Sequence, residues 1–171
     1  MSATSRRLTA ARGRVERSNG DEPGAAGSAS DAMRLTLQLD IPSDVRYIER
    51  IVELVARQCA EFRYPRQVCS LNVPVALTEA IANAILRGNK DDESKHVRVR
   101  AELDAHAIVL EVQDEGEGFD IDAYQPDTTT PSWLEREDGR GLFLMRKLMD
   151  RVERVPVDDR GTLVRLTLRL S

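Results

Sequence analysis

Polar and apolar residues alternate strictly over residues 34–41. The apolar side of this alternation consists of Leu35, Leu37, Leu39 and Ile41. Successive side chains of a β-strand point to opposite faces, so a period of two predicts a half-buried strand. We therefore expect the folded domain to cover residues 34–171 of this 171-residue chain.

Helical spacing replaces the alternation after Pro42. Apolar residues recur three and four positions apart, as on one face of a helix, at Val45, Ile48, Ile51, Val52, Val55 and Cys59. Ser43 precedes this run and is the expected N-cap, while Pro65 ends it. These signals predict a first helix between residues 43 and 65.

A second helical segment carries an apolar row formed by Leu77, Ile81 and Ile85. Gly88 is its expected C-terminal stop. The start depends on Pro74, because proline fits a helix only in the first turn or at a kink. The sequence leaves two starts open, one near Arg66 and one after Asn72.

Residues 97–103 and 108–112 alternate on either side of a turn at residues 104–107, which predicts an antiparallel hairpin. Residues 119–138 have no sustained period and contain Pro126 and Pro131. Such a long loop within a compact domain is usually functional.

Helical spacing returns at Leu142, and the polar pair Glu153 and Arg154 interrupts it. Val155 and Val157 then alternate as in a strand, residues 158–161 form a turn, and residues 163–170 form the last strand. The order β-α-α-β-β-loop-α-β-β predicts an α+β fold. We expect a two-layer sandwich in which helices cover one face of an antiparallel or mixed sheet.

Composition separates residues 1–33 from the rest of the chain. They are rich in Arg, Ala, Gly and Ser and hold almost no large apolar side chains. Such a segment buries too little surface to offset the entropy lost on ordering. We expect residues 1–33 to be a disordered tail.

The formal net charge of -4 gives no reason to expect direct nucleic-acid binding, although the extreme N-terminus is basic. The chain has two cysteines, Cys59 and Cys69, and no apolar run that approaches a membrane span. No secretory signal is evident in the first residues. We expect a cytoplasmic protein without a membrane partner.

Candidate chemistry begins on the second helix, where Glu79 and Asn83 lie one turn apart. Since each residue advances about 100°, this pair lies about 200° from the apolar row and points to one side. A carboxylate and a carboxamide in this arrangement can share one ligand. An isolated pair of this kind is also typical of a solvated helix face.

Asp114 follows a predicted strand, and Gly116 and Gly118 come after it. A carboxylate at a strand end is an acceptor of fixed direction, which suits an exocyclic amine such as that of adenine. Glycines beside it remove the Cβ atoms that would block a planar ring. A simple turn would also explain this composition.

Gly139, Arg140 and Gly141 precede the predicted helix that starts near Leu142. Free backbone N–H groups and the helix dipole make such a junction an anion site. Neither glycine pair completes a dinucleotide-binding fingerprint, because Ile121 and Leu144 occupy the third glycine position. The chain also lacks a P-loop, so both of these nucleotide folds are excluded.

The order of these motifs resembles a known superfamily. Glu79 with Asn83, Asp114 with its glycines, the Gly139 motif and Gly161-Thr162 resemble the motifs shared by DNA gyrase, the heat-shock chaperone ATPase, histidine kinases and mismatch-repair ATPases. The resemblance to this GHKL superfamily, with its Bergerat-type ATP-binding fold, spans about residues 34–170. Within it, Glu-Ala-x-x-Asn-Ala and Gly-Arg-Gly-Leu-Phe-Leu-Met resemble the bacterial anti-sigma factor serine-protein kinases of the partner-switching type.

The resemblance implies ATP and Mg²⁺ as cofactors. It makes Asn83 the Mg²⁺ ligand and Glu79 the catalytic base that accepts a proton from the attacking hydroxyl. Asp114 would accept the adenine amine, and residues 120–138 would be the nucleotide lid. The remaining cofactor-binding positions are Gly116 and Gly118 at the adenine, Gly139, Arg140, Gly141 and Leu142 at the phosphates, and Thr162 in support of Asp114.

The resemblance also implies partners, namely a sigma factor that the protein sequesters and a small anti-sigma-factor antagonist that it phosphorylates. It leaves a homodimer open. Arg87 stands where this family often has histidine, and its role stays open too. An ATP-binding regulator without phosphotransfer is the main alternative, against which Glu79 argues because binding alone needs no base. A histidine kinase is disfavoured, since residues 1–33 show no helical apolar period.

Overall fold

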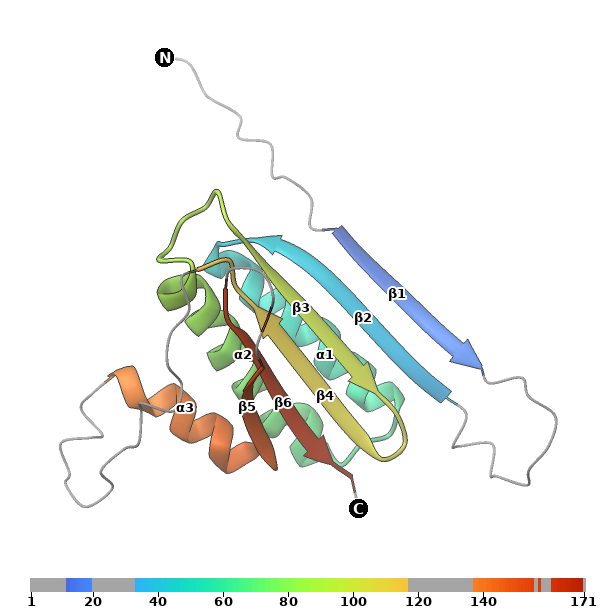
Figure 1. Cartoon of the computed structure of the whole chain (residues 1–171). Coiled ribbons are helices and arrows are strands. Elements are labelled where there is room, and N and C mark those ends of the chain that lie inside the picture. Colours follow the sequence, from blue (N-terminus) through green and yellow to red (C-terminus); the bar gives the residue numbers. More distant parts are fainter. Residues whose placement is uncertain (1–11, 20–32, 117–136, 156, 158–160, 171) are drawn as a thin grey trace, which may run out of the picture.

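The chain forms two layers, a sheet and a set of helices that cover one of its faces (Figure 1). This computed structural model describes residues 12–19, 33–116, 137–155, 157 and 161–170. The strands are β1 (Arg12–Asn19), β2 (Met33–Pro42), β3 (His96–Leu103), β4 (Ala107–Gln113), β5 (Arg151–Val155) and β6 (Leu163–Arg169). Within the described ranges they form one six-stranded sheet in the order β1-β2-β3-β4-β6-β5. Each neighbouring pair is antiparallel, which confirms the α+β prediction in its antiparallel form.

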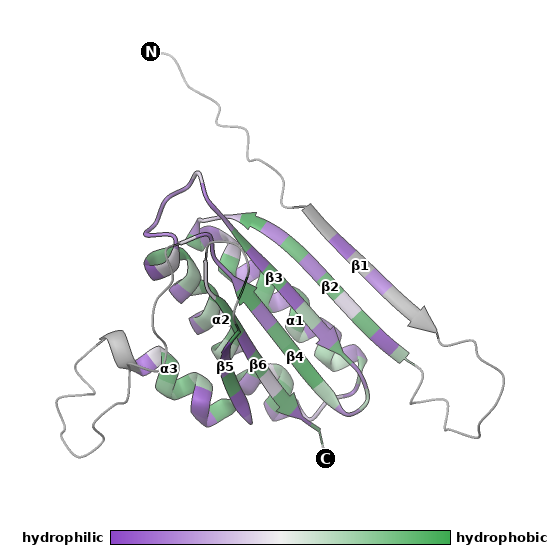
Figure 2. Cartoon of the chain, viewed as in Figure 1, coloured by the Kyte–Doolittle hydropathy of each residue, from purple (hydrophilic) through white to green (hydrophobic). Residues whose placement is uncertain are grey.

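The core lies between the sheet and the helices. Figure 2 shows the alternation of polar and apolar positions along β2, β3 and β4 that directs one face of the sheet inward. Fully buried side chains from both layers include Leu35, Ile41, Leu77, Ile81, Leu103, Ile108 and Leu110. The alternation read from residues 34–41 is confirmed, with Leu39 only partly buried.

The N-terminal strand corrects one expectation. Residues 1–33 were expected to be disordered, yet Arg12–Asn19 form β1, which pairs with β2 over its whole length from Arg12 opposite Asp40 to Asn19 opposite Met33. A strand can be ordered by backbone hydrogen bonds to a sheet edge, and composition does not report this non-local pairing. Residues 1–11 and 20–32 of the expected tail lie outside the described residues.

The N-cap of the first helical segment is Asp44, one residue after the expected Ser43. The side chain of Asp44, not Ser43, accepts a hydrogen bond from the Arg46 backbone N–H at 2.9 Å. A 3₁₀ turn (Val45–Tyr47) follows, and α1 (Ile48–Glu61) continues from it. Ser43 is instead buried, and its backbone N–H donates to the Lys95 carbonyl at 2.9 Å, because the chain there still follows the sheet.

The central helical segment starts at residue 66, so the earlier of the two expected starts is correct. It consists of a π-helical turn (Val68–Asn72), α2 (Val73–Asn83) and a second π-helical turn (Ala84–Gly88). Pro74 follows the first wide turn, where the regular bonding pattern is already changed, and such turns accommodate an interruption. Gly88 ends the helix as expected.

This helix also corrects the statement about membrane spans. In the part of the chain that the structure describes, Val68–Gly88 is long and apolar enough to cross a membrane, with a mean hydropathy of 1.4 over its best window. The same helix packs against α1 and α3 and lies over the sheet (Figure 1). A core helix of a globular domain passes the same test of length and composition.

Two boundaries in the C-terminal half differ from expectation. The last helix, α3 (Glu137–Leu148), begins at Glu137 and not near Leu142, so the Gly139 motif lies within its first turns. Most of the expected loop 119–138 lies outside the described residues. Glu153 belongs to β5 and pairs with Arg165 on the open face of the sheet, where polar side chains are normal.

Candidate active site

Asp114 lies at the end of β4 and is almost fully buried, with 1% of its surface exposed. Its Oδ1 accepts hydrogen bonds from the backbone N–H groups of Gly116 at 2.8 Å and Thr162 at 3.1 Å. Its own N–H donates to the Thr162 carbonyl at 3.0 Å. Since both bonds to the side chain hold Oδ1, the direction of the second oxygen is fixed as well.

The environment of Asp114 has opposing effects on its pKa. Burial raises the pKa of this carboxyl above its usual value, whereas the N–H groups of Gly116 and Thr162 lower it. The net direction is upward. The two backbone hydrogen bonds therefore offset part of the effect of burial on the pKa of Asp114, but not all of it.

Three glycines surround Asp114 so closely that larger residues do not fit. A Cβ at Gly88 would stand 2.7 Å from Asp114 Cβ, and a Cβ at Gly116 would stand 2.5 Å from the carbonyl carbon of Gly88. Gly161 has a φ of +120°, and a Cβ there would lie 2.9 Å from the Asp114 carbonyl carbon. The end of the central helix, the turn after β4 and the turn before β6 therefore meet at this carboxylate.

Sequence reasoning missed Asn89, which is fully buried beside this cluster. Its Oδ1 accepts a hydrogen bond from the Glu115 backbone N–H at 2.8 Å, and its Nδ2 donates to the His96 carbonyl at 2.9 Å. A polar residue directly after the expected helix stop was the only signal available. Gly88 was predicted only as the end of the helix, and sequence reasoning also missed its contact with Asp114.

Glu79 and Asn83 lie on the side of α2 that faces α3. A Cβ at Gly141 would stand 3.3 Å from Glu79 Cδ and 3.7 Å from Asn83 Nδ2, so the second glycine motif packs directly against this pair. Both side chains are half-buried, and Arg140 next to them is exposed. The structure thus brings the helix motif and the Gly139 motif together.

The N-terminal turn of α3 supplies the backbone groups expected for an anion. The N–H groups of the first turn of a helix have no partner within it, and Gly139 lies in this turn of α3. Leu142 has a different position, because it is 7% exposed and belongs to the hydrophobic core. Gly118 and residues 120–136 of the expected lid lie outside the described residues.

Comparison with known proteins agrees with this arrangement. The family model of the histidine kinase-like ATPase domain matches residues 41–168. The chain belongs to this family. An anti-sigma F factor of Bacillus velezensis is 36% identical over 101 residues, which are 58% of this chain and 68% of the relative. Anti-sigma F factors of Bacillus subtilis and Bacillus cytotoxicus are 35% and 36% identical over the same length.

Membership of the histidine kinase-like ATPase family confirms the resemblance drawn from the motifs and makes ATP the nucleotide. The residues present fit Mg²⁺ as well, because the half-buried Asn83 side chain beside the N-terminal turns of α3 offers a hard oxygen atom. Among the described residues, no group of three or more His, Cys, Asp or Glu side chains could hold a metal. The residues present fit a metal that shares its ligands with a nucleotide.

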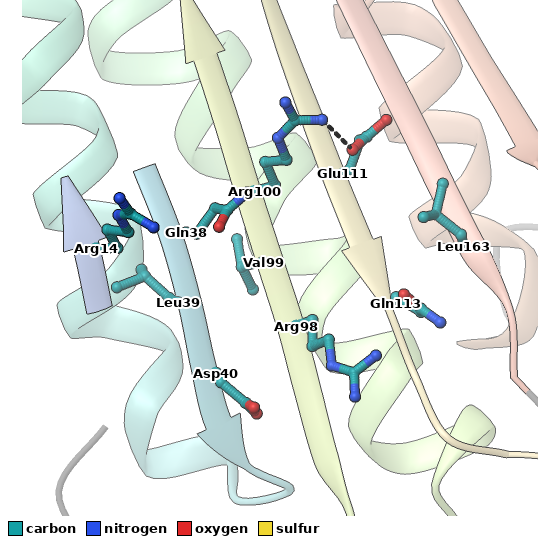
Figure 3. A pocket seen from close by; sticks show the side chains of 10 residues that line it. All are labelled: Arg14, Gln38, Leu39, Asp40, Arg98, Val99, Arg100, Glu111, Gln113 and Leu163. Carbon is teal, nitrogen blue, oxygen red and sulfur yellow. Dashed lines mark hydrogen bonds and ion pairs between the residues drawn. The ribbon is translucent and has the colours of Figure 1, made fainter. Parts of the chain in front are cut away.

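A hollow of about 460 Å³ lies elsewhere, on the open face of the sheet (Figure 3). It is lined by residues of β1, β2, β3, β4 and β6, among them Arg14, Asp40, Arg98 and Gln113. In its wall Glu111 accepts a hydrogen bond from Arg165 Nε at 2.8 Å. The residues of the ATPase motifs do not line it, so this hollow is not the site that the motifs form.

Proposed function

We propose that this protein is an ATP-dependent serine/threonine protein kinase and anti-sigma factor, whose substrate is a small anti-sigma-factor antagonist. The observation that carries the proposal is the contact of Gly141 with Glu79 and Asn83, which sets a carboxylate beside the N-terminal turn of α3. The ATPase family and relatives named anti-sigma F factor support it. A sigma factor is the corresponding second partner, and the proposal places the protein in the cytoplasm with both partners.

Each half of the site has a separate task in this proposal. Asp114 accepts the adenine amine, and the N-terminal turn of α3 at Gly139, together with the Arg140 side chain, binds phosphate oxygens. Asn83 is the residue that would hold Mg²⁺, which when bound neutralises charge on the triphosphate. Catalysis of this kind relies on positioning and on charge neutralisation.

Glu79 is the proposed general base. It accepts the proton of a serine or threonine hydroxyl, whose oxygen forms a bond to the γ-phosphorus as the bond from that phosphorus to the ADP oxygen breaks. The half-buried position of Glu79 beside Gly141 leaves the carboxylate close to the proposed phosphate site. A nucleotide-dependent regulator would have no use for this group.

The decisive experiment incubates the protein with labelled ATP, Mg²⁺ and the antagonist. Glu79→Gln keeps the shape of the side chain but removes the base, so phosphate transfer is expected to fall at least about 100-fold while ATP affinity changes little. Glu53→Gln, at an exposed position on α1, is the matched control and should transfer phosphate normally. Retained ATP binding without transfer by the unmodified protein would favour the regulator.

A further inference from the structure

Asn89 connects three segments of the chain through one buried residue. Its backbone N–H donates to the Ala84 carbonyl at 2.8 Å, which closes the last turn of the central helix. Its side chain donates to His96 at the start of β3 and accepts from Glu115 after β4. The helix that carries Glu79 is thereby tied to the turn that follows Asp114.

The bond to Glu115 acts on the backbone between Asp114 and Gly116. Those two residues are themselves joined by the 2.8 Å hydrogen bond from Gly116 N–H to Asp114 Oδ1. A second bond strengthens the same link, since the His96 N–H donates to Glu115 Oε2 at 3.0 Å. Gly88, the residue before Asn89, packs against the Asp114 side chain. Gly88 therefore restricts the Asp114 carboxylate, and Asn89 fixes the turn that follows it.

The chemistry of the position requires a carboxamide. Glu115 offers an N–H and needs an acceptor, whereas His96 offers a carbonyl and needs a donor. A short side chain that supplies both groups is that of asparagine. Loss of the amide would leave two partly buried backbone groups without this partner, and such a loss is unfavourable in a fold.

We propose that Asn89 is a positioning residue for adenine recognition, which acts through Asp114 by fixing the turn from Asp114 to Gly116. The inference rests on the proposed function, in which Asp114 accepts the adenine amine. Asn89 itself does not touch the nucleotide. It holds the Asp114 carboxylate in the direction of the adenine amine. An oxygen at the same ring position cannot donate a hydrogen bond to that carboxylate.

The test compares ATP with inosine triphosphate, which carries an oxygen in place of the adenine amine. Binding is measured by calorimetry for the full chain and for Asn89→Ala. The full chain is expected to prefer ATP by roughly ten- to hundredfold, the range of a hydrogen bond to a charged acceptor. Asn89→Ala should lose most of this preference, mainly through weaker ATP binding. Hydrogen exchange at the Glu115 amide should become faster in the same variant.

Two variants separate positioning from general loss of stability. Asn72→Ala removes a comparable bond at the other end of the helix, from Asn72 Nδ2 to the Leu148 carbonyl at 2.6 Å, and should keep the preference for ATP. Asn89→Asp keeps an acceptor for Glu115 and should restore part of the preference that Asn89→Ala loses.

The possible outcomes are distinct. A normal preference in Asn89→Ala, or an equal loss in Asn72→Ala, would overturn the role of Asn89 and leave the proposed function intact. No preference in the unmodified chain would overturn the adenine contact of Asp114, and with it the inference.

Discussion

The two halves of the candidate site are built in different ways. Around Asp114, backbone groups of the turns after β4 and before β6 hold a carboxylate that is 1% exposed. Around Glu79 and Asn83, half-buried side chains of one helix meet the first turns of another. The proposed adenine half is thus part of the folded framework, whereas the proposed phosphate half lies where two helices meet, nearer its surface. A change in the first should affect folding and nucleotide choice together, and a change in the second should affect phosphate transfer with little effect on stability.

The largest expected effect is that of Gly88→Ala. The new Cβ would meet the Asp114 side chain, which its hydrogen bonds prevent from moving, so unfolding free energy should fall by about 2–3 kcal/mol. Gly141→Ala is the matched change in the other half, where the Cβ meets the end of the longer Glu79 side chain. It should lower stability by less than about 1 kcal/mol and still abolish most phosphate transfer. Urea unfolding of both variants measures the difference, and equal losses of stability would refute the comparison.

A smaller effect is expected from Asp114→Asn, which keeps an oxygen for the N–H groups of Gly116 and Thr162. Burial raises the folded-state pKa of Asp114 above its ordinary value, so ionisation is harder in the folded chain than in the unfolded one. Stability that the protonated carboxyl supplies at low pH is therefore lost as the pH rises through the raised pKa. Because asparagine does not ionise, Asp114→Asn removes this pH-dependent loss of folding stability.

Measured from about pH 4 to pH 7, the unfolding free energy of the variant should improve relative to that of the unmodified protein. Its affinity for ATP should fall at the same time, because the amide is a weaker acceptor. A stability difference that shrinks with rising pH would contradict the assigned direction of the pKa.

The smallest effect is expected on the opposite face of the sheet. Glu111→Gln keeps the volume of the side chain but weakens its ion pairs with Arg165, at 2.7 Å, and Arg100, at 3.5 Å. Because this wall of the hollow is remote from the motifs, ATP affinity should change by less than about twofold. A larger loss, measured by the same calorimetry, would mean that the open face takes part in nucleotide binding.

Local patterns predicted most of the fold. The alternation in residues 34–41, the hairpin around residues 104–107 and the apolar row of α2 depend on the period of side chains within one segment. The helix motif and Asp114 could be found in the same way, because each is a residue type at a recognisable position in an element. The start of α3 was placed too late, since polar residues before Gly139 gave no apolar period.

Non-local contacts account for what the sequence did not reveal. β1 is ordered by its pairing with β2, and the sequence of Arg12–Asn19 does not predict that pairing. Asn89 and Gly88 gain their importance from His96, Asp114 and Glu115, which are distant along the chain or follow a different strand. Their meaning depends on tertiary structure and not on local spacing.

The pairing of β1 with β2 also bears on aggregation. An edge strand with unpaired N–H and carbonyl groups is a template on which other chains can add strands. β2 alternates leucines with polar residues and would be such an edge if β1 were removed. β1 instead presents Arg14 and Glu16 outward, with side chains 78% and 57% exposed, and charged residues at an edge discourage further pairing. We therefore expect removal of residues 12–19 to make the sheet edge more prone to pairing with other chains.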